Sequence, residues 1–235
     1  MVLYRLFVSA PTARLGLLTV LAFVVALLSA LVLHEIAHGL VALWNGDATA
    51  KYYGRLTLNP IKHFDWVGLI LMFLVGFGWA KPVPVNPSNF KNRKVGAITV
   101  SIAGVLTNLI LAFIGAMFYV VFTKITAKTE AATYALYFFE AVASLMCQLN
   151  VSFALFNLLP LFPLDGYRLL SCFINENNGA MTFLRKYSLY VMLGFIVLNS
   201  VPFLSVFSPF HWYIGEFGGL IQDGFYGFWR FIFNG

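Results

Sequence analysis

Residues Leu31–Leu43 read LVLHEIAHGLVAL and place two histidines and one glutamate inside a run that is otherwise apolar. On an α-helix His34 and His38 are four residues apart, so both imidazoles lie on one face, one turn apart, with Glu35 beside them. Two imidazoles at this spacing can bind one metal ion. Ionisable side chains inside an apolar helix are costly and usually functional, so this stretch predicts a metal site on a membrane helix.

The composition is that of an integral membrane protein. The 235 residues are 60% hydrophobic and only 10% charged, with a mean hydropathy of +0.84, whereas soluble domains carry about 25% charged residues. The net charge of +6 comes from Lys and Arg beside apolar runs, which indicates membrane topology and not a nucleic-acid partner. Cys147 and Cys172 lack a C-x-x-C spacing, so we expect packing residues and no disulfide.

The apolar runs predict an all-α, multi-pass membrane protein that folds as one domain over residues 1–235. A helix of about 20 apolar residues spans a bilayer, and three runs reach this length, namely Leu15–Trp44, Val95–Phe122 and Tyr134–Leu161. We expect them to form a three-helix core that carries the metal site. Further along, Leu189–Phe207 predicts an extra C-terminal span, and residues 208–235, rich in Phe, Trp and Tyr, predict an aromatic interfacial tail.

Two shorter segments are expected to lie at or within the membrane surface. Leu69–Trp79 is apolar but too short to span, and Gly76 and Gly78 interrupt it, which favours a re-entrant segment. Thr49–Leu58 is rich in β-prone residues around Gly54 and follows a helix-ending Asn-Gly-Asp, which predicts a short β-hairpin at the membrane surface.

Asp165 is the candidate third ligand. The run NLLPLFPLDG, Asn157–Gly166, contains prolines that break the third helix close to this carboxylate. Asp165 can share a metal with His34 and His38 only if an even number of crossings separates them, so Leu69–Trp79 must not cross. The Lys and Arg residues agree, because this arrangement with an external N-terminus places most of them inside, whereas a crossing would place most of them outside.

A zinc ion held by two His and one Asp keeps one coordination position open, as hydrolytic sites do. Zinc lowers the pKa of its bound water from 15.7 towards about 7, and Glu35 is placed to accept a proton as general base. The metal also neutralises the two buried carboxylates, which makes their burial tolerable.

Other polar residues allow more than one interpretation. Asp165 alone could be a turn residue that ends a helix. Asn108 lies inside the second span, where it could orient substrate or stabilise an oxyanion, form an interhelical hydrogen bond, or pack with Gly104. Asn157 is expected to cap or bridge helices, and His63 and His211 are expected at the surface.

Five motifs resemble the site-2 protease family of intramembrane zinc metalloproteases. They are HEIAH, GRLTLNP, GWAKPVPVNP, SIAGVLTN and NLLPLFPLDG, and they cover roughly Leu31–Arg168. The segment order resembles the small bacterial members, and no insert is long enough for a PDZ or CBS domain, which leaves open how substrates are chosen. The resemblance implies one Zn²⁺ per chain bound by His34, His38 and Asp165.

The resemblance also implies that Glu35 is the general base, that Asn108 lies near the bound peptide, and that the substrates are transmembrane proteins or remnant signal peptides. We therefore expect a peptidase in the cell membrane, with its N-terminus outside and its active site nearer the cytoplasmic side. The hairpin Thr49–Leu58 is the candidate clamp for an unwound substrate strand. The alternatives are a metal-ion transporter and a catalytically silent metal-binding scaffold.

Overall fold

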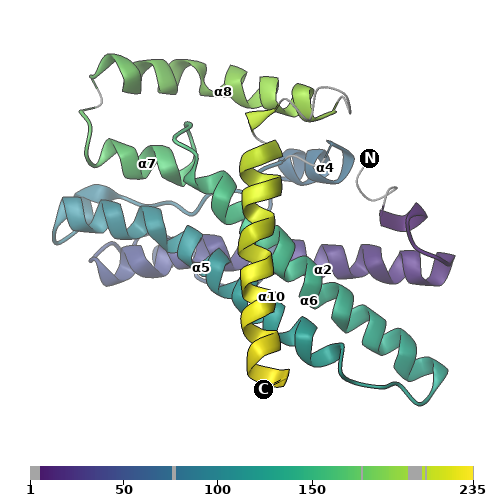
Figure 1. Cartoon of the computed structure of the whole chain (residues 1–235). Coiled ribbons are helices and arrows are strands. Elements are labelled where there is room, and N and C mark those ends of the chain that lie inside the picture. Colours follow the sequence, from purple (N-terminus) through teal and green to yellow (C-terminus); the bar gives the residue numbers. More distant parts are fainter. Residues whose placement is uncertain (1–5, 76–77, 176, 201–207, 210, 235) are drawn as a thin grey trace.

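The structure is a computed structural model that describes residues 6–75, 78–175, 177–200, 208–209 and 211–234. It is helical, and no β-strand occurs among these residues. Figure 1 shows three long helices, α2, α5 and α6, with the shorter elements gathered around them. The elements in chain order are α2 (Ala13–Trp44), α3 (Thr49–Tyr52), η1 (Pro60–His63), α4 (Trp66–Val75), η2 (Pro87–Asn89), α5 (Arg93–Phe122), α6 (Glu130–Leu158), α7 (Asp165–Ser171), α8 (Gly179–Ser200), η3 (His211–Phe217) and α10 (Gly218–Asn234).

The three long helices confirm the predicted core. In the described part of the chain, α2, α5 and α6 are the helices long and apolar enough to cross a membrane, with 32, 30 and 29 residues. At a rise of about 1.5 Å per residue, each is roughly 45 Å long. Their first turns are capped by Thr12, Asn92 and Thr129, whose side chains accept backbone N–H groups there.

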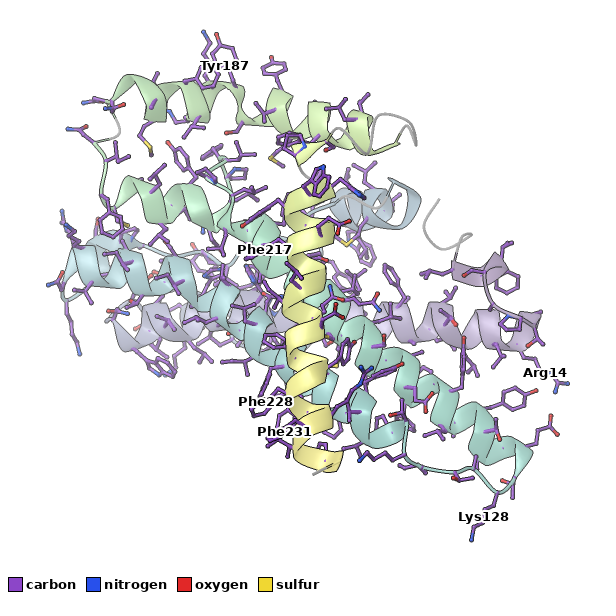
Figure 2. All side chains as sticks on the ribbon, in the orientation of Figure 1. Arg14, Lys128, Tyr187, Phe217, Phe228 and Phe231 are labelled. Atoms are coloured by element: carbon purple, nitrogen blue, oxygen red, sulfur yellow. The ribbon has the colours of Figure 1, made fainter. Side chains whose placement is uncertain are left out.

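The directions of the three helices satisfy the parity condition for the metal site. The starts of α2 and α6 lie together, because Thr19 Oγ1 is 2.8 Å from the Tyr137 hydroxyl and Arg14 pairs with Glu130 at 3.6 Å. Figure 2 places Arg14 and Lys128 at this end of the bundle. The start of α5 lies at the opposite end, where the Lys91 amide donates to the Asn45 carbonyl at 2.9 Å. The end of α6 therefore returns to the end of α2.

The predicted hairpin at Thr49–Leu58 is wrong. Thr49–Tyr52 forms the single helical turn α3, and Gly54, with φ +61°, lies in the turn that follows it. The turn begins because the buried Asp47 carboxylate accepts the Thr49 amide at 3.1 Å and the Thr49 hydroxyl at 2.5 Å. This local capping outweighs the β-propensity of the segment.

Asp47 also connects this turn to Asn86 and Asn89. The contribution of its charge to stability can be measured. Burial on its own would raise its pKa, but hydrogen bonds from Thr49, Asn86 and Asn89 stabilise the charged form and lower the pKa. Asp47→Asn replaces one acceptor with an NH₂ group that faces donors, so we expect the free energy of unfolding to fall by about 2 kcal/mol at neutral pH.

The difference between Asp47→Asn and wild type depends on pH in a defined direction. It is fully present above the ordinary Asp pKa of about 3.9, and it shrinks as the pH falls through the lower folded-state pKa, because wild-type Asp47 then becomes protonated. Denaturant unfolding of the purified protein in detergent at a series of pH values measures this. A difference that stayed constant below about pH 3 would contradict the assignment.

Helix α4 packs against the bundle, and a re-entrant path for this segment stays a prediction. Met72 on α4 forms a buried cluster with Phe23 and Leu27 of α2, against which α6 also packs. Further along, the Lys81 amide donates to the His63 carbonyl at 2.9 Å. At 10 residues, α4 is about 15 Å long, too short to span. His63, expected at the surface, is instead buried at 1% exposed, with Nε2 donating to the Thr57 carbonyl. His211 is exposed, as predicted.

The C-terminal region differs from its prediction. The expected extra span, Leu189–Phe207, falls partly on α8, and residues 201–207 lie outside the described residues. Among the described residues α8 is not one of the helices that could span a membrane, so a fourth span stays a prediction. The expected interfacial tail forms η3 and α10, and α10 crosses α5 and α6 (Figure 1), with Trp229 Nε1 donating to the Phe113 carbonyl at 3.0 Å. Both cysteines are free, as predicted.

Candidate metal centre

Three candidate ligand atoms from α2 and α7 converge at the end of the bundle where α6 ends and α7 begins. His34 Nε2 and His38 Nε2 are 3.0 Å apart, and Asp165 Oδ2 lies 3.3 Å and 3.1 Å from them. All three side chains are buried, and they are the group of potential metal ligands found among the described residues. The three residues singled out by spacing and parity therefore meet in space.

Hydrogen bonds fix which nitrogen of each imidazole faces the centre. His38 Nδ1 lies 2.7 Å from the Val100 carbonyl, which can only accept, so Nδ1 carries the proton. His34 Nδ1 lies 2.5 Å from Asn108 Oδ1. Asn108 is itself oriented because its NH₂ donates to Asn150 Oδ1, and Asn150 donates to the Met146 carbonyl. Both Nε2 atoms therefore present lone pairs, which is how second-shell partners orient metal-binding histidines.

The donor set fits zinc. Two imidazole lone pairs and a carboxylate oxygen face one another at about 3 Å, and Asp165 Oδ2 is buried without a hydrogen-bond partner. Three acceptors this close repel one another unless a cation lies between them. A tetrahedral ion about 2.1 Å from each would separate them by roughly 3.4 Å, close to the spacing observed.

Gly104 of α5 makes room for the two imidazoles. A Cβ atom there would lie 2.6 Å from His34 Nδ1 and 2.5 Å from His38 Nε2, closer than carbon and nitrogen can approach. For Gly104 the sequence indicated a packing face that it could share with Asn108. The structure shows that Gly104 packs against the imidazoles of His34 and His38, the candidate ligands.

We expect Gly104→Ala to lose zinc although alanine is the better helix former by about 1 kcal/mol. The methyl group displaces the imidazoles, so zinc per purified chain should fall at least about tenfold, as when outer-shell support of a metal is removed. Elemental analysis measures this. Gly194→Ala is the matched control, since no atom lies within 4 Å of its Cβ position. Full zinc content in Gly104→Ala would contradict the role of this contact.

Asp165 follows the proline-rich segment that ends α6. Helix α6 ends at Leu158, just before Pro160, and Asp165 lies in the first turn of α7, as the proline run predicted. Gly166 permits this return, because a Cβ there would collide with the carbonyl oxygens of Leu158 and Leu159. The Asp-Gly pair thus combines a ligand with the small residue that lets α7 pack against the end of α6.

Glu35 lies beside the ligands and is held by a segment far away in sequence. Its Oε2 accepts the Val83 amide proton at 2.7 Å. We call residues Lys81–Asn86 the strap. Pro82 and Pro84 keep their preceding residues in extended conformations and contribute no N–H group. Between these two prolines, Val83 supplies the N–H group that Glu35 accepts.

A cavity of about 480 Å³ opens onto the ligands and Glu35. Its walls are largely apolar, with polar side chains near the site. Besides the three candidate ligands and Glu35, the lining includes Val83, Asn157 and Arg168.

Asn108 is placed differently from what a peptide contact requires. Its side chain is fully buried, its amide is occupied by His34 and Asn150, and it is not among the cavity lining. Asn157 donates to the Phe153 carbonyl and also lines the cavity. The sequence analysis did not single out Asn150, although a polar side chain within a predicted span is a usable signal. It also did not single out Val83, because a backbone N–H that contacts a distant residue leaves no local sequence pattern.

A site with two imidazoles, one carboxylate and an adjacent second carboxylate is of the class found in zinc-dependent hydrolases. The chain belongs to peptidase family M50, whose family model matches residues 22–201. The metal of this centre is zinc, as the names of its relatives and the ligand group together indicate.

Two curated relatives carry the same description. The chain is 46% identical over 179 residues to "Putative zinc metalloprotease YwhC" of Bacillus subtilis (strain 168), covering 76% of this chain and 80% of that protein. It is 28% identical over 201 residues to "Putative zinc metalloprotease Rip2" of Mycolicibacterium smegmatis, covering 82% of this chain and 72% of that protein. No solved structure matches the chain significantly.

Proposed function

We propose that this chain is an intramembrane endopeptidase that hydrolyses peptide bonds within or next to the transmembrane segments of other membrane proteins. The observation that carries the proposal is the depth of the ligand group. His34 lies ten residues before the end of α2 at Trp44, about 15 Å along the helix axis. Ligands at that depth, on a helix apolar enough to span, serve substrates that are themselves in the bilayer.

The side chains divide the chemistry among them. His34, His38 and Asp165 hold zinc, which when bound lowers the pKa of water and polarises the scissile carbonyl. Glu35 Oε2 is held by Val83, so Oε1 is the atom that accepts a proton from the attacking water and later delivers it to the leaving amide nitrogen. Asn108 acts through His34 by fixing its ring.

The cavity suits an unwound stretch of peptide. A helical substrate has its backbone hydrogen bonds closed, so it must open locally before water can attack. The apolar walls can accept its side chains, and Asn157 and Arg168 supply polar groups near the ligands. Transmembrane proteins and remnant signal peptides are the substrate classes that combine apolar side chains with membrane insertion.

In the proposed orientation the N-terminus lies outside and the site lies nearer the cytoplasmic side. Basic residues gather at the metal-side end of the bundle, as positive-inside topology requires. They lie between the end of α2 and the first turn of α5, at Lys51, Lys62, Lys91, Arg93 and Lys94. In this orientation α4 enters from the inside and returns to the inside, as a re-entrant segment does.

Cleavage in proteoliposomes tests the proposal. Purified protein is reconstituted with a model protein that carries one transmembrane helix, and the products are mapped by mass spectrometry. We expect a cut within or next to the helix, loss of cleavage after chelation, and recovery after zinc is added back. Cleavage confined to soluble loops, or none at matched zinc occupancy, would refute it.

The transporter alternative lacks structural support among the described residues. An ion pathway needs successive ligand sets, and the described part of the chain holds the one group at His34, His38 and Asp165. A catalytically silent scaffold would gain nothing from Glu35 beside the ligands. The substitution Glu35→Gln separates such a scaffold from a peptidase.

A further inference from the structure

We propose that Arg55 and Asp47 are positioning residues for Glu35, acting through the strap, whose two ends they clamp. The inference rests on the proposed role of Glu35 as general base. Both residues lie in the loop that follows the metal-binding helix α2, so the helix that carries Glu35 and the clamps of the strap belong to one continuous stretch of chain.

Arg55 holds the first residue of the strap. Its guanidinium donates from Nη2 to the Lys81 carbonyl at 2.6 Å, and the Lys81 amide donates to the His63 carbonyl at 2.9 Å. The Arg55 side chain is 7% exposed, and no ion-pair partner for it occurs among the described residues. Burying an unpaired cation is costly. The contact that offsets this cost is the hydrogen bond from the Arg55 guanidinium to the Lys81 carbonyl at the start of the strap.

Asp47 holds the last residue of the strap. Its Oδ2 accepts the Asn86 amide at 2.7 Å, and its Oδ1 accepts from the Asn89 side chain at 2.8 Å. The two ends of the strap are thus fixed by buried groups of opposite charge. The two charges match these contacts, because the Arg55 cation donates to a backbone carbonyl and the Asp47 anion accepts from a backbone amide.

The middle of the strap is fixed against the ligand helix. Val83 is 6% exposed, and its side chain lies against Gly39, where a Cβ would approach Val83 Cγ1 to 3.2 Å. This contact sets the distance between strap and helix, and it aims Val83 N–H at Glu35. A glutamate has three rotatable bonds, so a donor held in place restricts the Glu35 side chain and leaves Oε1 as the carboxylate oxygen that Val83 does not engage.

Cysteine labelling tests the clamp without any catalytic readout. Val83→Cys is made in a chain that also carries Cys172→Ser, while Cys147 is buried and stays. A membrane-impermeant maleimide should react slowly, and at least about tenfold faster when Arg55→Ala or Asp47→Ala releases the strap. Lys62→Ala is the matched control, an exposed cation of the same loop that also contacts a backbone carbonyl. Equal rates in all backgrounds would overturn the clamp.

Cleavage kinetics test the effect on Glu35. We expect Arg55→Ala to lower kcat by about 10- to 100-fold, with KM within about twofold and zinc content and thermal unfolding unchanged. Arg55→Lys should recover part of kcat, since lysine can still donate to Lys81. Val83→Pro, which removes the N–H but keeps an extended backbone, should lower kcat far more than Val83→Ala, which keeps it.

These outcomes separate the two proposals. If wild type does not cleave, the proposed function fails, while the labelling rates still decide whether Arg55 and Asp47 hold the strap. If wild type cleaves, an unchanged kcat in Arg55→Ala overturns the positioning role. A loss of kcat that matches a loss of zinc or of thermal stability also overturns it, because Arg55 would then support the fold as a whole.

Discussion

Glu35→Gln is expected to keep one zinc per chain and to lose peptide hydrolysis. Glutamine has the same size, and its Oε1 oxygen can still accept the Val83 amide proton, so the strap stays in place. Its NH₂ group cannot accept a proton from water. General base catalysis contributes about 10²- to 10⁴-fold, so cleavage in proteoliposomes should fall by about that factor. Zinc content is measured on the same preparation by elemental analysis.

The matched control for this substitution is Glu130→Gln. It makes the same chemical change at the opposite end of the bundle, where Glu130 is exposed and pairs with Arg14 at 3.6 Å. Its cleavage rate should equal that of wild type. Equal proteolysis by Glu35→Gln and wild type would refute the base assignment. In cells, proteins that accumulate uncut in the membranes of a Glu35→Gln strain identify the physiological substrates.

Asp165→Asn is expected to lose zinc and, with it, activity. The ligand atom Oδ2 is buried, without a hydrogen-bond partner, and 3.1–3.3 Å from both Nε2 atoms. An amide is neutral and a weaker donor to zinc, so the centre loses a charge that offsets the dication. Loss of an outer-shell partner costs about 10- to 100-fold in metal affinity, and loss of a ligand should cost more.

Competition with a chromophoric chelator measures this affinity in detergent. Asp223→Asn, which removes an exposed carboxylate from α10, should bind zinc like wild type. Wild-type affinity in Asp165→Asn would show that the third ligand lies elsewhere. Because zinc bound to the native state raises stability by mass action, the thermal shift on adding zinc should shrink in parallel.

Much of this protein follows from local pattern. The spacing of His34 and His38, the lengths of the three spans, and the proline break before Asp165 depend on helical periodicity and on what proline forbids. Parity then brought Asp165 to the end of α2 without any knowledge of packing. These inferences survive because the bilayer restricts long apolar segments to helices that cross or do not cross.

Other features depended on contacts between distant segments. The β-prone run after α2 becomes a helical turn because Asp47 caps it and Asn86 and Asn89 bind the same carboxylate. His63 is buried by the return of the chain after α4, and the aromatic tail packs across α5 and α6. Propensity is a weak preference that tertiary contacts override.

The sequence by itself determined the class of protein, the three candidate ligands and the helices that carry them, since these follow from residue type, spacing and segment length. Only the tertiary structure decided how the ligands are prepared. Asn108 and Val100 select the imidazole nitrogens that face Asp165, Gly104 makes room for the rings, and the strap holds Glu35. Each of these is a contact of one or two atoms across a long sequence separation, which periodicity does not encode.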